Sequence, residues 1–188
     1  IIFGMNTFLK KSAAAALLVA LGIIGRVVPH VWNMTPMVGI SLFSGSRIGA
    51  RWAIAVPILA MFASDWLLGW YEWQIVMTVY ASFALSGLAG YFMRNRIGSL
   101  SLAGLSAGSS IVFFLTTNAA VWLWSGMYPA GLQGLAMSLA AGLPFFRPML
   151  IGDILFTFAI FGAYAWYTRL VHSRAPEAAR DAALVRAA

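Results

Sequence analysis

Apolar segments alternate with short polar segments along almost the whole of this 188-residue chain. The chain is 62% hydrophobic and 9% charged, whereas a soluble domain carries about 25% charged residues. It therefore lacks the polar side chains that would be needed to face water on all sides, and a bilayer is the solvent that suits it. Because a helix satisfies its backbone hydrogen bonds within one segment, the pattern predicts an all-α integral membrane protein.

Six apolar segments are candidates for transmembrane helices, since a spanning helix needs about 20 mostly apolar residues. The second segment is short and contains glycine, so we expect a half-helix or a broken span there. The candidates are residues 12–28, 35–46, 50–70, 73–93, 99–124 and 145–167. Between the last two, the Gly- and Pro-containing residues 125–144 predict an outer loop with a short helix on or in the membrane surface.

The ends of the chain are more polar than its middle, which predicts a three-part organisation. Residues 1–11 are expected to form an N-terminal cytoplasmic segment, and residues 12–170 the six-helix transmembrane domain. Residues 171–188 are expected to form a cytoplasmic tail, either a surface helix or a disordered end.

Positive charge is distributed unequally between the two ends of the predicted bundle. Ten of the twelve basic residues lie in segments on one side, and cytoplasmic loops are the ones that retain Lys and Arg. Both termini are therefore predicted to be cytoplasmic. The net charge of +7 is explained by basic residues that orient the protein in the membrane, and it does not indicate nucleic-acid binding. The ten residues are Lys10, Lys11, Arg47, Arg51, Arg94, Arg96, Arg169, Arg174, Arg180 and Arg186.

Other polar residues gather at the opposite, outer end. Four different segments each place a polar residue about 3–10 Å inside the outer boundary, as measured along the helix at about 1.5 Å per residue. These residues are Arg26, Asp65, Asn118 and Asp153. Since a charged residue near the membrane centre costs about 2.5–3.5 kcal/mol, such side chains normally face the bundle interior and are paired. We expect Arg26 to pair with Asp65, and Arg147 to pair with Asp153 or Asp65.

Two interpretations of this cluster stay open. The ion pairs could simply fasten helix ends together, or the cluster could form an amphipathic pocket for a small ligand. In the second case, hydrogen bonds and charge would come from Arg26, His30, Asn33, Asp65, Asn118, Arg147 and Asp153. Aromatic side chains would stack on the ligand or close over it, namely Trp32, Trp66, Trp70, Trp122 and Tyr128.

The composition argues against several kinds of catalytic and metal site. The chain has no cysteine, which excludes thiolate catalysis, iron–sulfur clusters and Cys-ligated zinc. It also lacks a P-loop and an H-E-x-x-H motif. No second His or Cys lies at metal-ligand spacing from His30, so a hydrogen-bonding role is favoured for that residue. We expect no catalytic residues, no cofactor and no metal site, and hence a protein that is not an enzyme.

Several motifs resemble those of a small, uncharacterised bacterial family of transport-type membrane proteins. The resemblance extends from Arg26 to Tyr167. The motifs are Arg26-Val-Val-Pro-His30, Asn33-Met-Thr-Pro36, Ser64-Asp65-Trp-Leu-Leu-Gly69, Thr117-Asn118 with Tyr128-Pro129, and Leu143-Pro-Phe-Phe-Arg147 leading to Gly152-Asp153.

That family in turn resembles the substrate-binding (S) components of energy-coupling-factor (ECF) vitamin transporters, including the small cobalamin-uptake types. The resemblance implies a six-helix protein of the bacterial inner membrane that takes up a small water-soluble nutrient from outside, such as a vitamin or a vitamin precursor. Some cobalamin-type relatives ligate cobalt through a cysteine, and this chain departs from that pattern.

Delivery to the cytoplasm would occur by rocking on an ATP-driven ECF-type module or without a partner. Ala16 and Ala20 lie one helical turn apart in the first segment, a spacing that lets another helix approach closely. They are the candidate docking face for such a module. The alternative is a structural or assembly subunit of a larger membrane complex, in which the polar cluster only fastens helices.

Overall fold

The computed structural model describes the backbone of residues 2–29 and 33–187 and the side chains of residues 7–29 and 33–173. Within these ranges all regular secondary structure is helical, which confirms the all-α prediction. The long helices are α1 (Ile2–Val27), α3 (Ala50–Leu68), α4 (Trp73–Met93), α5 (Ser99–Trp124) and α6 (Leu132–Ala187). The short elements are α2 (Met37–Phe43), the π-helical turn η1 (Ser44–Ile48) and the 3-10 turn η2 (Arg94–Arg96).

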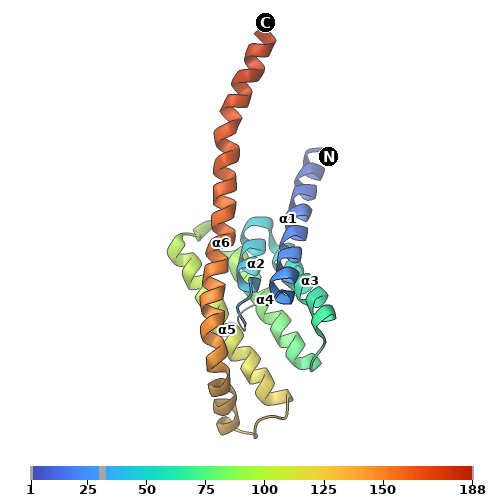
Figure 1. The fold of residues 1–188 in the computed structure, drawn as a ribbon, viewed down its shortest axis with the longest axis vertical. Helices are drawn as coiled ribbons and strands as arrows, with labels where there is room; N and C mark the ends of the chain where they lie inside the picture. The colour runs from blue at the N-terminus through green and yellow to red at the C-terminus, as the bar shows by residue number, and fades with distance from the viewer. Residues whose placement is uncertain (1, 30–32, 188) are drawn as a thin grey trace.

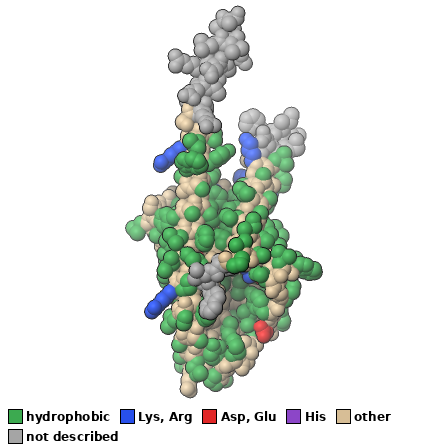
Figure 2. Space-filling view, viewed as in Figure 1, with side chains coloured by type: hydrophobic (Ala, Val, Ile, Leu, Met, Phe, Trp, Pro, Cys, Tyr) green, Lys and Arg blue, Asp and Glu red, His purple; other side chains and the backbone are tan. Residues whose placement is uncertain are grey.

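Five described segments are long and apolar enough to cross a membrane: Thr7–Val27, Ala50–Leu68, Trp73–Arg96, Ser99–Trp124 and Leu132–Ser173. Hydrophobic side chains cover most of the face seen in Figure 2, as expected of a surface that contacts lipid. α2 and η1 have seven and five residues. At 1.5 Å per residue they rise about 18 Å together, well short of the roughly 30 Å hydrocarbon core. The prediction of a short second segment is confirmed.

The start of α1 and the end of α6 lie at one end of the molecule, and the α5–α6 connection lies at the other (Figure 1). We call the end that carries the α5–α6 connection the outer end. The five membrane-length segments, with the short α2 and η1 between the first and the second of them, bring the start of α1 and the end of α6 to the same side.

α2 lies at the centre of the bundle. Every residue of this helix is buried, and α2 contacts α1, α3, α4, α5 and α6. Glycines make the close approach possible, since a Cβ added at Gly45 would overlap the carbonyl oxygen of Gly87, and one added at Gly90 would overlap that of Leu42. Small residues are needed here because helices in lipid associate through close van der Waals contact.

Three basic residues at the end opposite to the outer end, Arg47, Arg51 and Arg94, lie over aromatic rings. The guanidinium carbon of Arg47 lies 5.7 Å from the ring centroid of Tyr164, and that of Arg51 lies 4.9 Å from the ring centroid of Phe8. Such cation–π contacts hold a charged head group beside an amphipathic ring. They connect the start of α3 to α1, and η1 to α6.

The prediction for residues 125–144 is wrong. An outer loop with a short helix on or in the membrane surface was expected there, whereas α6 is continuous from Leu132 to Ala187. The connection is limited to residues 125–131. Pro144 and Pro148 remain inside the helix, as membrane helices allow when neighbouring groups satisfy the freed carbonyls. The start of α6 therefore continues the last span instead of lying on the membrane surface.

Both predicted end segments are also helical. α1 begins at Ile2, so residues 2–11 belong to the first helix and not to a separate segment. The backbone of the predicted tail continues α6 as far as Ala187. Of the two alternatives for the tail, a helix and a disordered end, its backbone therefore adopts the helix.

Substituting the packed glycines should separate tight helix contacts from open ones. In Gly87→Ala the new Cβ would meet the carbonyl oxygen of Ala53 in α3, so we expect a loss of about 1–3 kcal/mol in the free energy of unfolding. An alanine at Gly104 in α5 would meet no atom within 4 Å, and that variant should be as stable as the wild type. Chemical denaturation in detergent micelles measures both. An equal loss in the two variants would contradict the packing described.

Candidate functional site

A cavity of about 200 Å³, which we call the main cavity, opens where helices α1 to α6 converge. Its polar lining consists of Arg26, Asn33, Thr35, Tyr71 and Asp153. Its apolar lining consists of Val38, Met61, Val79, Phe83, Phe113 and Met149. A few polar groups among aromatic and aliphatic walls are the usual composition of a small-molecule site.

A second cavity of about 150 Å³ adjoins the main cavity and shares Asn33, Phe113 and Met149 with it. Its remaining walls are mostly aromatic and include Phe114 and Phe146, whose ring centroids lie 4.7 Å apart. The combined volume of the two cavities lies just within the lower end of the range of about 300–1,000 Å³ that is typical of small-molecule sites.

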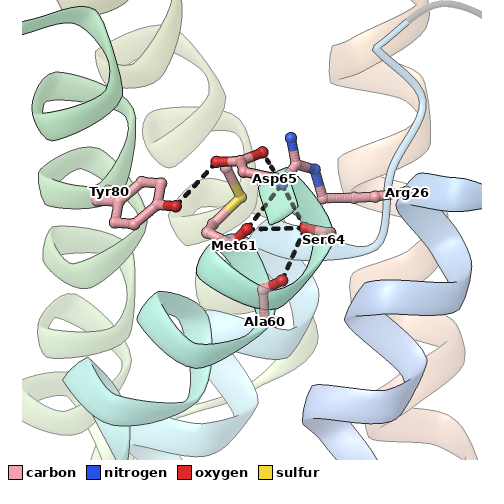
Figure 3. A network of polar contacts seen from close by, with 6 residues as sticks. All are labelled: Arg26, Ala60, Met61, Ser64, Asp65 and Tyr80. Carbon is pink, nitrogen blue, oxygen red and sulfur yellow. Dashed lines mark hydrogen bonds and ion pairs between the residues drawn. The ribbon is translucent and has the colours of Figure 1, made fainter. Parts of the chain in front are cut away.

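Arg26 is in the last turn of α1 and forms an ion pair with Asp65 of α3, with 2.7 Å between Nη1 and Oδ1. The same nitrogen also donates to the Ser64 hydroxyl and to the Met61 carbonyl. On the other side, the Tyr80 hydroxyl of α4 donates to Oδ2 of Asp65 at 2.8 Å (Figure 3). The predicted pairing of Arg26 with Asp65 is confirmed, and it joins α1, α3 and α4.

Asp65 is only 1% exposed, and each of its carboxylate oxygens has a partner. It does not line the main cavity; it stands behind Arg26, which does. This carboxylate compensates the charge of the guanidinium and holds it in place. Asp65 thus supports one wall of the cavity instead of facing a ligand.

Asp153 of α6 lines the main cavity and is 2% exposed. Its Oδ2 accepts a hydrogen bond of 2.6 Å from the Ser110 hydroxyl of α5. Among the described residues, no cation pairs with Asp153 and Ser110 is its only hydrogen-bonding partner. One turn further along, the hydroxyls of Ser106 and Thr157 lie 3.2 Å apart and connect the same two helices. Within the described part of the chain, the buried carboxylate of Asp153 is therefore only partly satisfied.

The prediction that Arg147 pairs with Asp153 or Asp65 is wrong. Arg147 is exposed, and the ion pair that the described part of the chain contains is the one between Arg26 and Asp65. Arg147 and Asp153 are six residues apart on α6, which places them on different faces of the helix.

Asn118 and Asn33 contribute to the cavities in different ways. Asn118 lines the second cavity, and its side-chain amide donates to the Phe114 carbonyl at 2.8 Å. Its backbone carbonyl accepts a hydrogen bond from the Ser138 hydroxyl of α6. Asn33 lines both cavities, and its φ of 60° turns the chain just before α2.

Four of the five aromatic residues predicted to cover the ligand lie outside the two cavities. Trp66 and Trp70 are 71% and 52% exposed, as expected of aromatic anchors at a membrane interface. The indole nitrogen of Trp122 donates to the Pro129 carbonyl and so closes the α5–α6 connection. These three residues and the half-buried Tyr128 line neither cavity. His30 and Trp32 lie outside the described residues.

Tyr71, Phe83 and Phe113 line the main cavity and were not predicted from the sequence, nor was Ser110 as the partner of Asp153. On α5 a signal was present, because Ser106, Ser110, Phe113 and Thr117 recur at helical spacing on one face. Tyr71 lies in the α3–α4 connection. Partial burial, and to a lesser extent the negative charge of Asp65, raise the pKa of its phenol to about 12. The positive charge of Arg26 lowers this pKa but does not outweigh the other two effects. Tyr71 therefore stays protonated and can donate a hydrogen bond at the cavity wall.

Residues Gly104, Ser106 and Gly108 have the G-x-S-x-G spacing of a hydrolase nucleophile. Ser106 lies in the middle of α5 with its hydroxyl against Thr157, not on a strand-to-helix turn. Among the described residues, no group of three or more His, Cys, Asp or Glu side chains is placed to hold a metal ion.

The family model described as "Family of unknown function (DUF6580)" matches residues 6–177, which include every residue that lines the two cavities. The chain belongs to this family. No curated protein sequence and no solved structure matches the chain. For this DUF6580 protein, function therefore has to be argued from the site itself.

Removing the charge of Asp65 should destabilise the bundle. In Asp65→Asn the guanidinium of Arg26 loses its ionised partner, and we expect a loss of about 3 kcal/mol in the free energy of unfolding. The exposed Arg147, which has no ion pair in the described part of the chain, provides the control, and Arg147→Ala should change stability by less than about 0.5 kcal/mol. Urea or SDS titration in micelles would show the difference. Wild-type stability in Asp65→Asn would mean that this ion pair does not fasten the helices.

Proposed function

We propose that this protein takes up a small water-soluble nutrient, such as a vitamin or a vitamin precursor, from the extracytoplasmic side of the bacterial inner membrane. The observation that carries the proposal is the partly satisfied carboxylate of Asp153 on the wall of the main cavity. Ionisable side chains within a membrane are costly and mark substrate or ion pathways by default. A carboxylate that serves only to join helices would be expected to have a full set of protein partners, as Asp65 has.

The position of the cavity supports access from outside. Arg26 is in the last turn of α1 and Tyr71 is in the α3–α4 connection, so two lining residues come from the ends of helices. The charge distribution predicts that these ends face away from the cytoplasm. A nutrient arriving from that side would meet the polar lining before the aromatic one.

The size of the cavities restricts the nutrient. The main cavity measures about 200 Å³ and the adjoining one about 150 Å³. A corrinoid is several times larger than both together, so the cavities favour a smaller molecule that contains about one ring system.

Delivery to the cytoplasm needs a further step, and we propose that α1 docks on an ATP-driven ECF-type module. Ala16 and Ala20 are exposed, and α1 has the smallest buried share of the five membrane-length segments. An alanine-lined helix surface permits the close helix contact on which association in lipid depends.

A second candidate function is that of a structural or assembly subunit. It is favoured by the network of Arg26, Asp65 and Tyr80, which fastens three helices and would do so without any ligand. The two functions make different demands on Asp153, because only uptake requires its carboxylate to face a bound molecule.

The experiment compares Asp153→Asn with Glu72→Gln after purification into lipid nanodiscs. Both substitutions remove one carboxylate at the outer half of the protein, but Glu72 is exposed and lines neither cavity. Native mass spectrometry should detect a small molecule that co-purifies with the wild type and with Glu72→Gln. Asp153→Asn should lose this molecule while it keeps the wild-type unfolding midpoint. Equal retention in both variants, or no bound molecule in any of the three proteins, would favour the assembly role.

A further inference from the structure

We propose that the molecule bound in the main cavity is a small ring-bearing amine, whose ammonium group pairs with Asp153 and whose ring lies against Phe83 and Phe113. This inference rests on the proposed function, because it names the substrate class of the same site. Three features of the cavity carry it: the balance of charge on its walls, the unused hydrogen-bonding capacity of Asp153, and the aromatic surface beside that carboxylate.

The described lining of the main cavity contains two charged residues, Arg26 and Asp153. The charge of Arg26 is compensated by Asp65, at 2.7 Å. Asp153 has no such partner among the described residues, and the Ser110 hydroxyl that contacts it is neutral. While Asp153 is ionised, the described lining therefore carries the net charge of one carboxylate, which attracts a cation and repels an anion.

The ion pair with Asp65 makes Arg26 a weaker anion receptor than an unpaired guanidinium would be. Its Nη1 is directed toward α3, where it contacts the Met61 carbonyl, the Ser64 hydroxyl and the carboxylate of Asp65. A carboxylate or phosphate on the ligand would have to compete with a buried internal anion for the same guanidinium. Such a ligand would also lie in the same cavity as Asp153, and like charges at close range cost energy.

An ammonium group matches the hydrogen bonds that Asp153 leaves open. Ser110 contacts Oδ2 of Asp153, and no described residue donates to Oδ1. An ammonium has three donors and no acceptor. One donor can reach Oδ1, and the Thr35 hydroxyl and the Asn33 side-chain amide on the same cavity wall offer further acceptors.

The walls beside Asp153 are suited to a ring and to a cation. Phe83 of α4 and Phe113 of α5 form a tilted pair with ring centroids 4.8 Å apart, and both line the main cavity. Aromatic faces attract a nearby ammonium and pack against a planar ring. The adjoining cavity, with Phe114 and Phe146 on its walls, gives the ring room to extend.

The test uses three probes of similar size that differ in charge: benzylamine, benzyl alcohol and benzoate. Each is titrated at pH 7 into the full-length protein, freed of any co-purified molecule, in phosphatidylglycerol nanodiscs, and binding is followed by calorimetry. We expect benzylamine to bind at least ten-fold more tightly than benzyl alcohol, and benzoate to bind least. Asp153→Asn should remove the ten-fold preference, and the control Glu72→Gln should retain it.

Ser110→Ala provides a second variant that keeps the carboxylate but removes the hydroxyl that orients it. We expect this variant to bind benzylamine a few-fold more weakly and to keep part of the preference, so the test does not depend on Asp153→Asn alone.

Preferred binding of benzoate, or an amine preference that persists in Asp153→Asn, would overturn the substrate class and leave the uptake proposal standing, because a ligand would still occupy the site. Failure of all three probes to bind would also overturn the substrate class. The uptake proposal itself would fail on its own test, if the wild-type protein carried no co-purified small molecule or if Asp153→Asn and Glu72→Gln retained that molecule equally.

Discussion

A charge that is buried in a bilayer has no water to solvate it, so each charged group must find its partners within the protein or in a ligand. The ion pair between Arg26 and Asp65 satisfies this requirement internally and joins α1 to α3, while Tyr80 extends the network to α4. The main cavity depends on this pair, because Arg26 forms part of its wall. Asp153 differs in that its partners among the described residues leave one oxygen open.

The rest of the bundle is organised around a helix that is too short to span the membrane. α2 is buried along its whole length, and glycines in η1 and α4 allow the backbones to approach closely. Just before α2, Asn33 and Thr35 reach the main cavity, so the same short helix positions part of its polar lining.

The sequence predicts the features that depend on hydropathy and charge. Helical segments, the short second segment and the pairing of Arg26 with Asp65 follow from apolar length and from the cost of an unpaired charge in lipid. Features that depend on rotation about a helix axis were harder to predict. Arg147 and Trp66 lie at the expected depth but face outward, and depth along a helix does not determine which face a residue occupies. The continuity of α6 through Pro144 was missed because a proline that ends a helix in water is tolerated in a packed membrane helix.

Asp65 has a protein partner on each carboxylate oxygen, whereas Asp153 has a described partner on one of them. The functional proposal depends on that difference. A crystal structure of the protein, grown from a lipidic phase without added ligand, tests it most directly. The account predicts non-protein density in the main cavity within hydrogen-bonding distance of the Asp153 carboxylate, with Arg26 still bound to Asp65. A carboxylate of Asp153 that pairs with a basic side chain of the protein, beside a cavity filled by a lipid chain, would contradict it.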